Sequence, residues 1–190
     1  MKFKFALLFL LFCSFGFGQT SYRMGSFSVV IKGTSNLHNW ESVAKEVRSN
    51  GSFTSDATGL SAIQSLYVEI PVRSIKSAKG TIMDNKTYDA MKADQYANIQ
   101  YKLDRVQQIN KKGNGNFDLN AQGELTMAGN TRKIDLYVQG KVNSDGSVSF
   151  NGSKKLKMTD FKIKPPTALL GTLTTGDEVE IVFQITLKQG

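Results

Sequence analysis

The feature that most constrains the fold of this chain is a repeated alternation of apolar and polar residues with a period of two. The clearest run is Lys133 to Val142, in which Ile134, Leu136 and Val138 alternate with charged or polar neighbours. Successive side chains of a β-strand point to opposite faces, so this run predicts a strand with one apolar and one polar face. The chain is therefore expected to consist mainly of half-buried strands.

Eight segments carry this alternation, clearly or weakly. They are Phe27 to Lys32, Val43 to Phe53, Leu66 to Arg73, Ile99 to Val106, Phe117 to Met127, Lys133 to Val142, Val148 to Met158 and Glu178 to Lys188. Gly, Asn and Asp residues suited to tight hairpins separate them, as at Asn50-Gly51 and Ser144-Asp145-Gly146. Connections this short leave no room for helical crossovers, so neighbouring strands are expected to pair antiparallel.

One stretch differs, because Tyr88, Met91 and Lys92 follow a helical spacing behind Asp84, a residue suited to the N-cap. It predicts one short helix over Asp84 to Asp94. Closing the sheet on itself buries eight apolar faces without a second layer and leaves no exposed edge. The predicted fold is all-β: an eight-stranded antiparallel barrel with one short helix. Such a barrel either fills with side chains or holds one ligand, and the pattern leaves both open.

The first 18 residues are typical of a secretory signal peptide, since Lys2 and Lys4 precede an apolar run from Phe5 to Phe17. That run is shorter than the roughly 20 residues of a membrane-spanning helix. Cleavage is expected between Gly18 and Gln19, which leaves residues 19–190 as one exported domain, periplasmic or secreted. The only cysteine, Cys13, would leave with the leader, so no disulfide is expected.

Loss of Lys2 and Lys4 lowers the formal net charge from +8 to +6. The basic pairs Lys111-Lys112 and Lys154-Lys155 are not interleaved with aromatic residues, so a nucleic-acid partner is not expected. The positive charge is typical of a solvated surface or of attraction to anionic lipid, which would allow transient contact with a membrane surface. A single histidine without clustered ligands predicts no metal site, and the sequence shows no activated nucleophile, so no enzyme is expected.

Four segments, in order along the chain, resemble landmarks of the YceI-like family of lipid-binding proteins. Thr34 to Trp40 is similar to its S-x-x-H-x-W stretch, and Lys92 to Ile99 to its helix-to-strand junction. Gly123 to Arg132 resembles its G-x-L-T-hydrophobic-x-G-x-T-K/R hairpin, and Leu156 to Ile163 its hydrophobic-x-R/K-x-D-F-x-I segment. The Pro165 to Gly171 loop resembles a variant found in part of the family.

The resemblance implies a lipocalin-like barrel over residues 19–190 whose interior binds a polyisoprenoid, a fatty-acyl lipid or another long-chain amphiphile, without catalysis or a further cofactor. Better-known members carry a His-Leu-Arg-Ser motif on the helix, where this chain has Asn85 to Asp89. Headgroup contacts that depend on that motif are therefore not expected here.

Candidate ligand-binding residues come from the inward faces, the helix and the loop before the last strand. They are Phe27, Val29, Ile31, His38, Trp40, Leu66, Val68, Ile70, Tyr88, Met91, Ile134, Leu136, Phe161, Leu169, Leu170, Ile181 and Phe183. Several have a structural alternative: His38 as a turn residue, Trp40 as core or as a cap whose N–H reaches solvent or ligand, and Tyr88 and Met91 as the buried stripe of a capping helix. Leu169 and Leu170, with the helix, either form a portal or pack over the barrel mouth.

Two other functions fit the same pattern. A barrel with a filled core would serve as an interaction or stress protein. A small outer-membrane barrel would turn its apolar face to lipid, but it usually ends on an aromatic residue, whereas this chain ends Leu187-Lys188-Gln189-Gly190. The sequence leaves a homodimer open.

Overall fold

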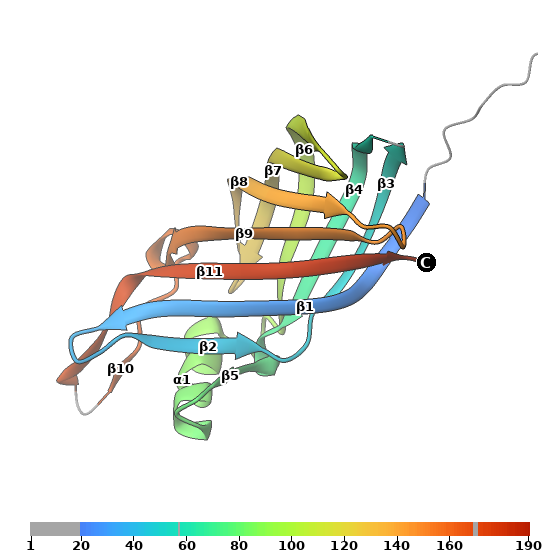
Figure 1. The fold of residues 1–190 in the computed structure, drawn as a ribbon. Coiled ribbons are helices and arrows are strands. Elements are labelled where there is room, and N and C mark those ends of the chain that lie inside the picture. The colour runs from blue at the N-terminus through green and yellow to red at the C-terminus, as the bar shows by residue number, and fades with distance from the viewer. Residues whose placement is uncertain (1–19, 57, 169–170) are drawn as a thin grey trace, which may run out of the picture.

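The structure is a computed structural model that describes residues 20–56, 58–168 and 171–190 (Figure 1). In these residues it contains eleven strands, one α-helix and two short 3-10 helices. The strands are β1 (Thr20–Ser35), β2 (Trp40–Ala44), β3 (Arg48–Asp56), β4 (Gly59–Pro71), β5 (Ile75–Ser77), β6 (Asn98–Gly113), β7 (Asn116–Met127), β8 (Asn130–Val142), β9 (Val148–Lys157), β10 (Thr167–Ala168) and β11 (Leu173–Gln189). The helices are η1 (Val72–Ser74), α1 (Thr81–Met91) and η2 (Met158–Phe161).

Eight of the described strands form a closed antiparallel ring. Its order is β11, β9, β8, β7, β6, β4, β3 and β1, and β1 pairs again with β11. The closing ladder runs from Tyr22 opposite Gln189 to Ser35 opposite Thr175. The three remaining strands extend the sheet, since β2 pairs with β1, β5 with β2, and β10 with β11. The predicted eight-stranded antiparallel barrel with one helix is confirmed.

The predicted strand Val43 to Phe53 is divided in two. β1 pairs with β2 near one of its ends and with β3 near the other. Between β2 and β3 the chain leaves the ladder, Lys45 N–H donates to the Ser74 carbonyl at 2.9 Å, and Val47 is buried beside Val29. The break therefore allows an apolar side chain to pack where a regular strand would continue.

Asn50-Gly51 lies inside β3, so the prediction of a hairpin turn there was wrong. Gly51 serves a different purpose: a β-carbon at this position would lie 2.8 Å from the ring of Phe53. The turn itself lies between Asp56 and Gly59, where the Thr58 N–H donates to the Asp56 carboxylate at 2.7 Å. Gly51 therefore leaves space for the Phe53 ring and does not reverse the direction of the chain.

A β-bulge at Gly25 changes which residues of β1 point inward. Tyr22 and Val29 are both buried, although seven positions apart they would lie on opposite faces of a regular strand. The register shifts between Met24 and Ser26, which leaves Gly25 as the extra residue. The bulge returns the apolar face of β1 to the barrel interior.

The helix α1 begins at Thr81, and Gly80 occupies the N-cap position without a side-chain capping bond. The prediction that Asp84 caps the helix was wrong, as were the predicted bounds. The buried Asp84 carboxylate instead accepts a hydrogen bond from the Ser77 N–H at 2.7 Å. That bond ties the first turns of the helix to β5 rather than closing the end of the helix.

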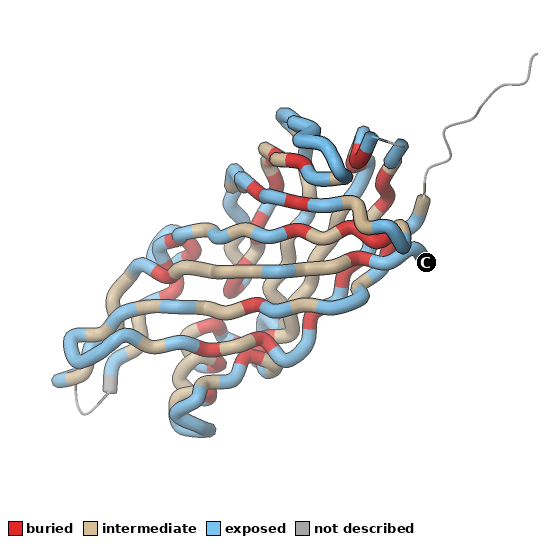
Figure 2. Tube along the Cα trace, in the orientation of Figure 1, coloured by how far each residue is buried: buried red, intermediate tan, exposed pale blue. Residues whose placement is uncertain are grey.

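Buried residues alternate with half-buried or exposed ones along strands such as β7 (Figure 2). They form two large clusters at opposite ends of the strands. One contains Tyr88 and Met91 of α1 together with η2, and the other contains aromatic residues from β1, β3, β7 and β9. A third, smaller cluster surrounds Val29. The apolar faces thus point into the barrel, and the polar faces point outward.

Candidate functional site

The barrel interior contains a cavity of about 140 Å³. Each of the eight strands of the ring contributes at least one lining side chain. The lining consists of Val29, Ser49, Ile63, Leu66, Val68, Ile70, Ile99, Tyr101, Leu103, Leu119, Ala121, Leu125, Ile134, Leu136, Val138, Phe150, Lys154, Leu156, Ile181, Phe183, Ile185 and Leu187. The lining includes Leu156 of the cluster under α1 as well as Phe150 and Leu187 of the aromatic cluster, so this small volume is drawn out along the barrel as a narrow cavity. An apolar chain fits such a space better than a bulky polar molecule.

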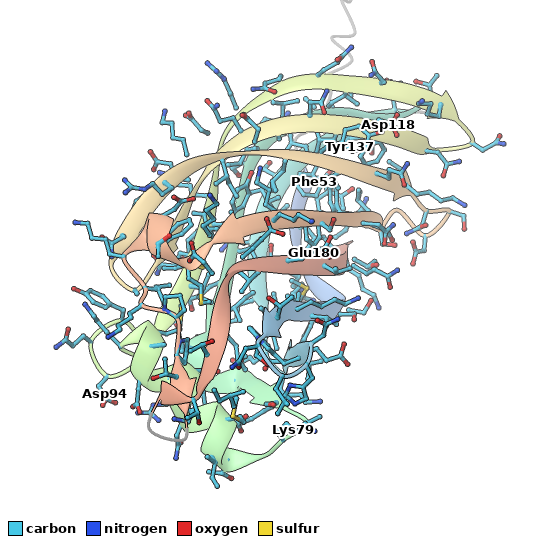
Figure 3. All side chains as sticks on the ribbon, turned by 90° about the vertical axis from the view of Figure 1, so that its left-hand side faces the viewer. Phe53, Lys79, Asp94, Asp118, Tyr137 and Glu180 are labelled. Carbon is cyan, nitrogen blue, oxygen red and sulfur yellow. The ribbon has the colours of Figure 1, made fainter. Side chains whose placement is uncertain are left out.

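One end of the cavity is closed by packed aromatic rings. Tyr22 stacks on Phe53 with ring centroids 4.6 Å apart, and Phe150 packs edge-on against both Phe53 and Phe117 at 5.8 Å. The Tyr22 hydroxyl donates to the Gly146 carbonyl at 3.1 Å, which holds the ring in place. Phe53 lies among the strands in Figure 3, well above α1. This end is filled with side chains.

The other end is covered by α1. The Tyr88 hydroxyl lies 2.9 Å from the Arg73 carbonyl and 3.1 Å from the Ile75 carbonyl, as a donor, and accepts a hydrogen bond from Lys76 Nζ at 2.6 Å. This last bond, with the nearby carboxylate of Asp84, raises the pKa of Lys76. Tyr88 therefore anchors the helix to the chain segment before it.

A further hydrogen bond joins α1 to the segment that precedes β11. Lys86 Nζ donates to the Thr167 carbonyl at 3.0 Å. The helix and this segment consequently lie side by side at one end of the barrel. Both elements belong to the predicted portal, but Leu169 and Leu170 lie outside the described residues.

Three lining residues bring polar side-chain atoms to the cavity. Ser49 Oγ is satisfied, because it donates to the Tyr67 carbonyl at 2.8 Å. Burial raises the pKa of Tyr101 to about 12, so its phenol is a neutral hydroxyl at physiological pH. Lys154 is half-buried on β9, at the same inward parity as Phe150 and Leu156. The remaining lining is apolar.

Eight of the predicted site residues line this cavity. They are Val29, Leu66, Val68, Ile70, Ile134, Leu136, Ile181 and Phe183. Phe27 packs in the cluster around Val29, whereas Ile31, Tyr88, Met91 and Phe161 belong to the cluster under α1. These five lie beside the cavity rather than in its lining.

His38 lies in the turn between β1 and β2, and Trp40 is the first residue of β2. The Trp40 ring covers Gly33, where a β-carbon would meet it at 2.3 Å, and its Nε1–H donates to the Thr34 carbonyl at 3.0 Å. The indole N–H thus faces the chain's own backbone rather than solvent or ligand. His38 is exposed, and its Nδ1 lies 3.3 Å from the Ser35 hydroxyl, which also accepts the His38 backbone N–H. This geometry is that of a turn residue, which is the structural alternative to a ligand contact for His38.

Several lining residues were missed among the predicted candidates, although the alternation could have found them. Ile99, Tyr101 and Leu103 follow the period of two in β6. Lys154 occupies an inward position between Phe150 and Leu156, and a lysine in an apolar register is itself a signal. Which side of each strand lines a cavity, however, depends on the closure of the ring.

The ladder between β8 and β9 covers only part of the two strands. The two strands pair only from Val138 opposite Gly152 to Val142 opposite Val148. Beyond Val138, β8 continues to pair with β7, and beyond Gly152, β9 continues to pair with β11. Figure 1 shows the two strands diverging from their hairpin. We call the stretches 130–137 and 153–157, which do not pair with each other, the β8–β9 window.

In the described part of the chain, no group of three or more His, Cys, Asp and Glu side chains is arranged to hold a metal ion. Within the same residues, no helix has the length and apolar character needed to cross a membrane.

Solved structures similar to this chain share the barrel. BcnA of Burkholderia cenocepacia superimposes with a TM-score of 0.64 at 20% identity, covering 84% of this chain and 95% of BcnA. A domain from Saccharophagus degradans, described as polyisoprenoid binding and implicated in plant cell wall breakdown, gives a TM-score of 0.69 at 10% identity, covering 91% and 100%. The YceI protein of Campylobacter jejuni gives 0.56 at 20% identity, covering 78% and 85%.

No curated protein sequence matches the chain. At 20% identity or less, the structural likenesses show a common fold. The sequence profile of the YceI-like domain, in contrast, matches residues 20–187, which include every strand of the barrel ring apart from the last two residues of β11. The chain therefore belongs to the YceI-like domain family.

Proposed function

We propose that this protein is a lipid-binding protein that holds a long apolar chain, such as a polyisoprenoid or another long-chain amphiphile, inside its barrel. The observation that carries the proposal is the narrow cavity whose apolar lining comes from all eight strands of the ring. Burial of apolar surface contributes roughly 25 cal/mol per Å² before the costs of association, so longer chains should bind more tightly. The polyisoprenoid-binding neighbour from Saccharophagus degradans supports the same class of ligand.

The proposed ligand contacts are the side chains that line the cavity. Of the residues nominated by sequence, Val29, Leu66, Ile134 and Phe183 represent four different strands around it. Residues outside the lining, such as Tyr88 and Phe161, would act indirectly by fixing the end under α1.

We propose that the apolar tail of the lipid enters the barrel beside α1. The opposite end is plugged by the aromatic rings around Phe53, and its connections are short and polar. At the near end, the described residues of α1 and of the segment at Thr167 are joined by the exposed hydrogen bond from Lys86. A short helix and a loop can move at modest cost, whereas a packed aromatic cluster cannot.

We also propose that the protein is exported and that it binds its ligand without catalysing a reaction. Residues 1–18 would direct the protein across the cytoplasmic membrane as a signal peptide, with the domain acting in the periplasm or outside the cell. The apolar faces of the strands point inward, which favours this function over an outer-membrane barrel, whose apolar face contacts lipid. The cavity favours it over a filled core.

The test is to purify the protein from the envelope of the exporting organism and to identify bound lipid by mass spectrometry. An isoprenoid or fatty-acyl species is expected in wild-type protein. Leu136→Trp would fill the cavity and remove the lipid, while Tyr137→Trp, at the neighbouring outward position, would retain it. Circular dichroism would verify that both variants are folded. Protein that is reproducibly empty would contradict the proposal and favour a filled barrel.

A further inference from the structure

The β8–β9 window borders the cavity directly. The inward-facing side chains along its two edges are Ile134 and Leu136 on β8 and Lys154 and Leu156 on β9, and all four line the cavity. Its far end is framed by Arg132, whose Nε–H donates to the Asp160 carbonyl at 2.8 Å. The window therefore places the basic side chains of Lys154 and Arg132 beside apolar residues of the cavity lining.

Among the described residues, Lys154 is a charged side chain of this window that faces inward and has no partner. In the described residues its ammonium group makes neither a hydrogen bond nor an ion pair. The adjacent Lys155, which points outward, lies 3.3 Å from Glu178, and Lys133 across the window lies 2.9 Å from Asp104. An inward lysine without a counterion is unfavourable unless its stem lies on apolar surface and its head reaches water or an anion.

The barrel has a comparable divergence between β4 and β6, which pair only from Tyr67 to Pro71. That gap lies at the aromatic end, where the buried Leu60 and Ile63 of β4 pack against β6 and β7 residues of the same cluster. Its inward positions on β4 and β6 carry no charge. The β8–β9 divergence is also lined by apolar side chains, since Leu156 is buried and Ile134 packs against its cluster, but it differs in carrying the inward-facing Lys154.

We propose that Lys154 binds the anionic headgroup of a single-chain amphiphile, a carboxylate or a phosphate, whose tail occupies the cavity. This inference rests on the proposed lipid-binding function and specifies the ligand class. The headgroup sits in the β8–β9 window beside Lys154, with the positive charge of Arg132 at the far end of the same window. An ammonium group that donates to an anion forms a charge-assisted hydrogen bond, which is stronger than a neutral one.

The direction of the tail follows from the position of Lys154. Ile181 of β11 lies opposite Lys154, and Leu187, which also lines the cavity, lies six residues further toward the aromatic end. Six strand residues span about 20 Å. The tail therefore runs from the window toward Phe150 and the closed end, and the headgroup stays at the wall near α1.

The test uses three probes with the same tail: hexadecanoate, hexadecyl phosphate and 1-hexadecanol. Each is titrated against delipidated wild-type protein, Lys154→Met, and the control Lys155→Met, which removes a neighbouring outward charge. Wild type and Lys155→Met should bind the better of the two anionic probes about tenfold or more tightly than the alcohol, as expected for a charge-assisted bond. Lys154→Met should bind all three alike, and Lys154→Arg should restore the preference.

Each outcome of these titrations leads to a single conclusion. The anionic probe with the higher affinity assigns the headgroup as carboxylate or phosphate. An anionic preference that persists in Lys154→Met, or wild type that binds all three probes equally, would overturn this inference and leave the lipid-binding function intact. Wild type that binds none of the three would instead refute the proposed function itself.

Discussion

The ring of Tyr101 on β6 lies across Gly123 on the neighbouring strand β7. A β-carbon at Gly123 would come within 2.5 Å of the ring and of its hydroxyl oxygen. The glycine thus leaves the space that allows a large aromatic side chain to lie flat against the wall and line the cavity instead of filling it. These two residues on adjacent strands thus shape one side of the cavity.

Gly123→Ala is expected to force the Tyr101 ring away from β7. The displacement should cost about 1 to 3 kcal/mol of unfolding free energy, as is usual for overpacked sites, and should reduce lipid binding. Urea unfolding and titration with a long-chain lipid would measure both effects. The double variant Gly123→Ala with Tyr101→Leu should recover most of the loss, and equal losses in the single and double variants would contradict this explanation.

Phe53→Ala is expected to open the closed end of the cavity. Phe53 is 1% exposed and contacts the rings of Tyr22 and Phe150, so its removal should cost about 3 to 5 kcal/mol of unfolding free energy. The space created should also shift the preference toward longer chains. Tyr137→Ala, which truncates a 55% exposed aromatic residue, is the control and should change both properties little. A destabilised variant with an unchanged chain-length profile would show that the aromatic cluster does not limit the ligand.

Lys86→Met is expected to accelerate lipid exchange several-fold, because it removes the hydrogen bond that joins α1 to Thr167. An exposed hydrogen bond contributes only about 1 kcal/mol, so the melting temperature should fall slightly. Exchange of a fluorescent fatty acid, measured by stopped flow, would test this. Lys79→Met, just before the helix, is the control for loss of a charge. Exchange that is equally fast in wild type and Lys86→Met would contradict a portal beside α1.

Asp56 is expected to contribute to acid sensitivity. Hydrogen bonds from Ser61, Thr58 and Lys111 hold the pKa of its carboxyl well below the ordinary value of 3.8. A carboxyl group whose pKa is lower in the folded state stabilises the fold above its unfolded pKa, and this stabilisation is lost as the pH falls through the lower value.

Asp56→Asn should therefore be less stable than wild type at pH 7 and should converge with it as the pH falls below about 4. Chemical unfolding at a series of pH values would give the two curves. Glu124→Gln, at an exposed position of β7, controls for the loss of a negative charge. Parallel curves for wild type and Asp56→Asn would exclude a contribution from this carboxylate.

The strand pattern predicted the barrel because the period of two identifies the apolar face of each strand independently of its neighbours. The pattern did not predict that Gly51 makes room for the ring of Phe53 instead of forming a turn. It also did not predict the bulge at Gly25, after which the opposite set of β1 side chains points inward. Asp84 has the residue type of a cap, but the β5 backbone supplies a closer donor. Such choices depend on tertiary contacts, which a single segment does not encode.

The candidate site was predicted less completely than the fold. Alternation identified inward residues such as Ile134 and Leu136, since their strand is regular throughout. It did not reveal the role of Lys154, because a lysine at an inward position has meaning only where the adjacent strands separate. The separation of β8 and β9 depends on the whole ring, because β8 pairs along its length with β7 and β9 pairs along its length with β11.

The ladder between β1 and β11 joins the first and the last strand that the structure describes, and this has a consequence for folding. Tyr22 and Gln189, 167 positions apart, meet in this last seam of the barrel. Pairings between distant residues form slowly, because closing a long loop lowers the conformational entropy of the chain before the new contacts offset that loss. The ring can therefore close only once the final strand has emerged, and until then the apolar faces remain exposed to aggregation. A chaperone that shields the growing sheet would act before β11 arrives, and truncation within β11 would leave an open sheet with two unpaired edges.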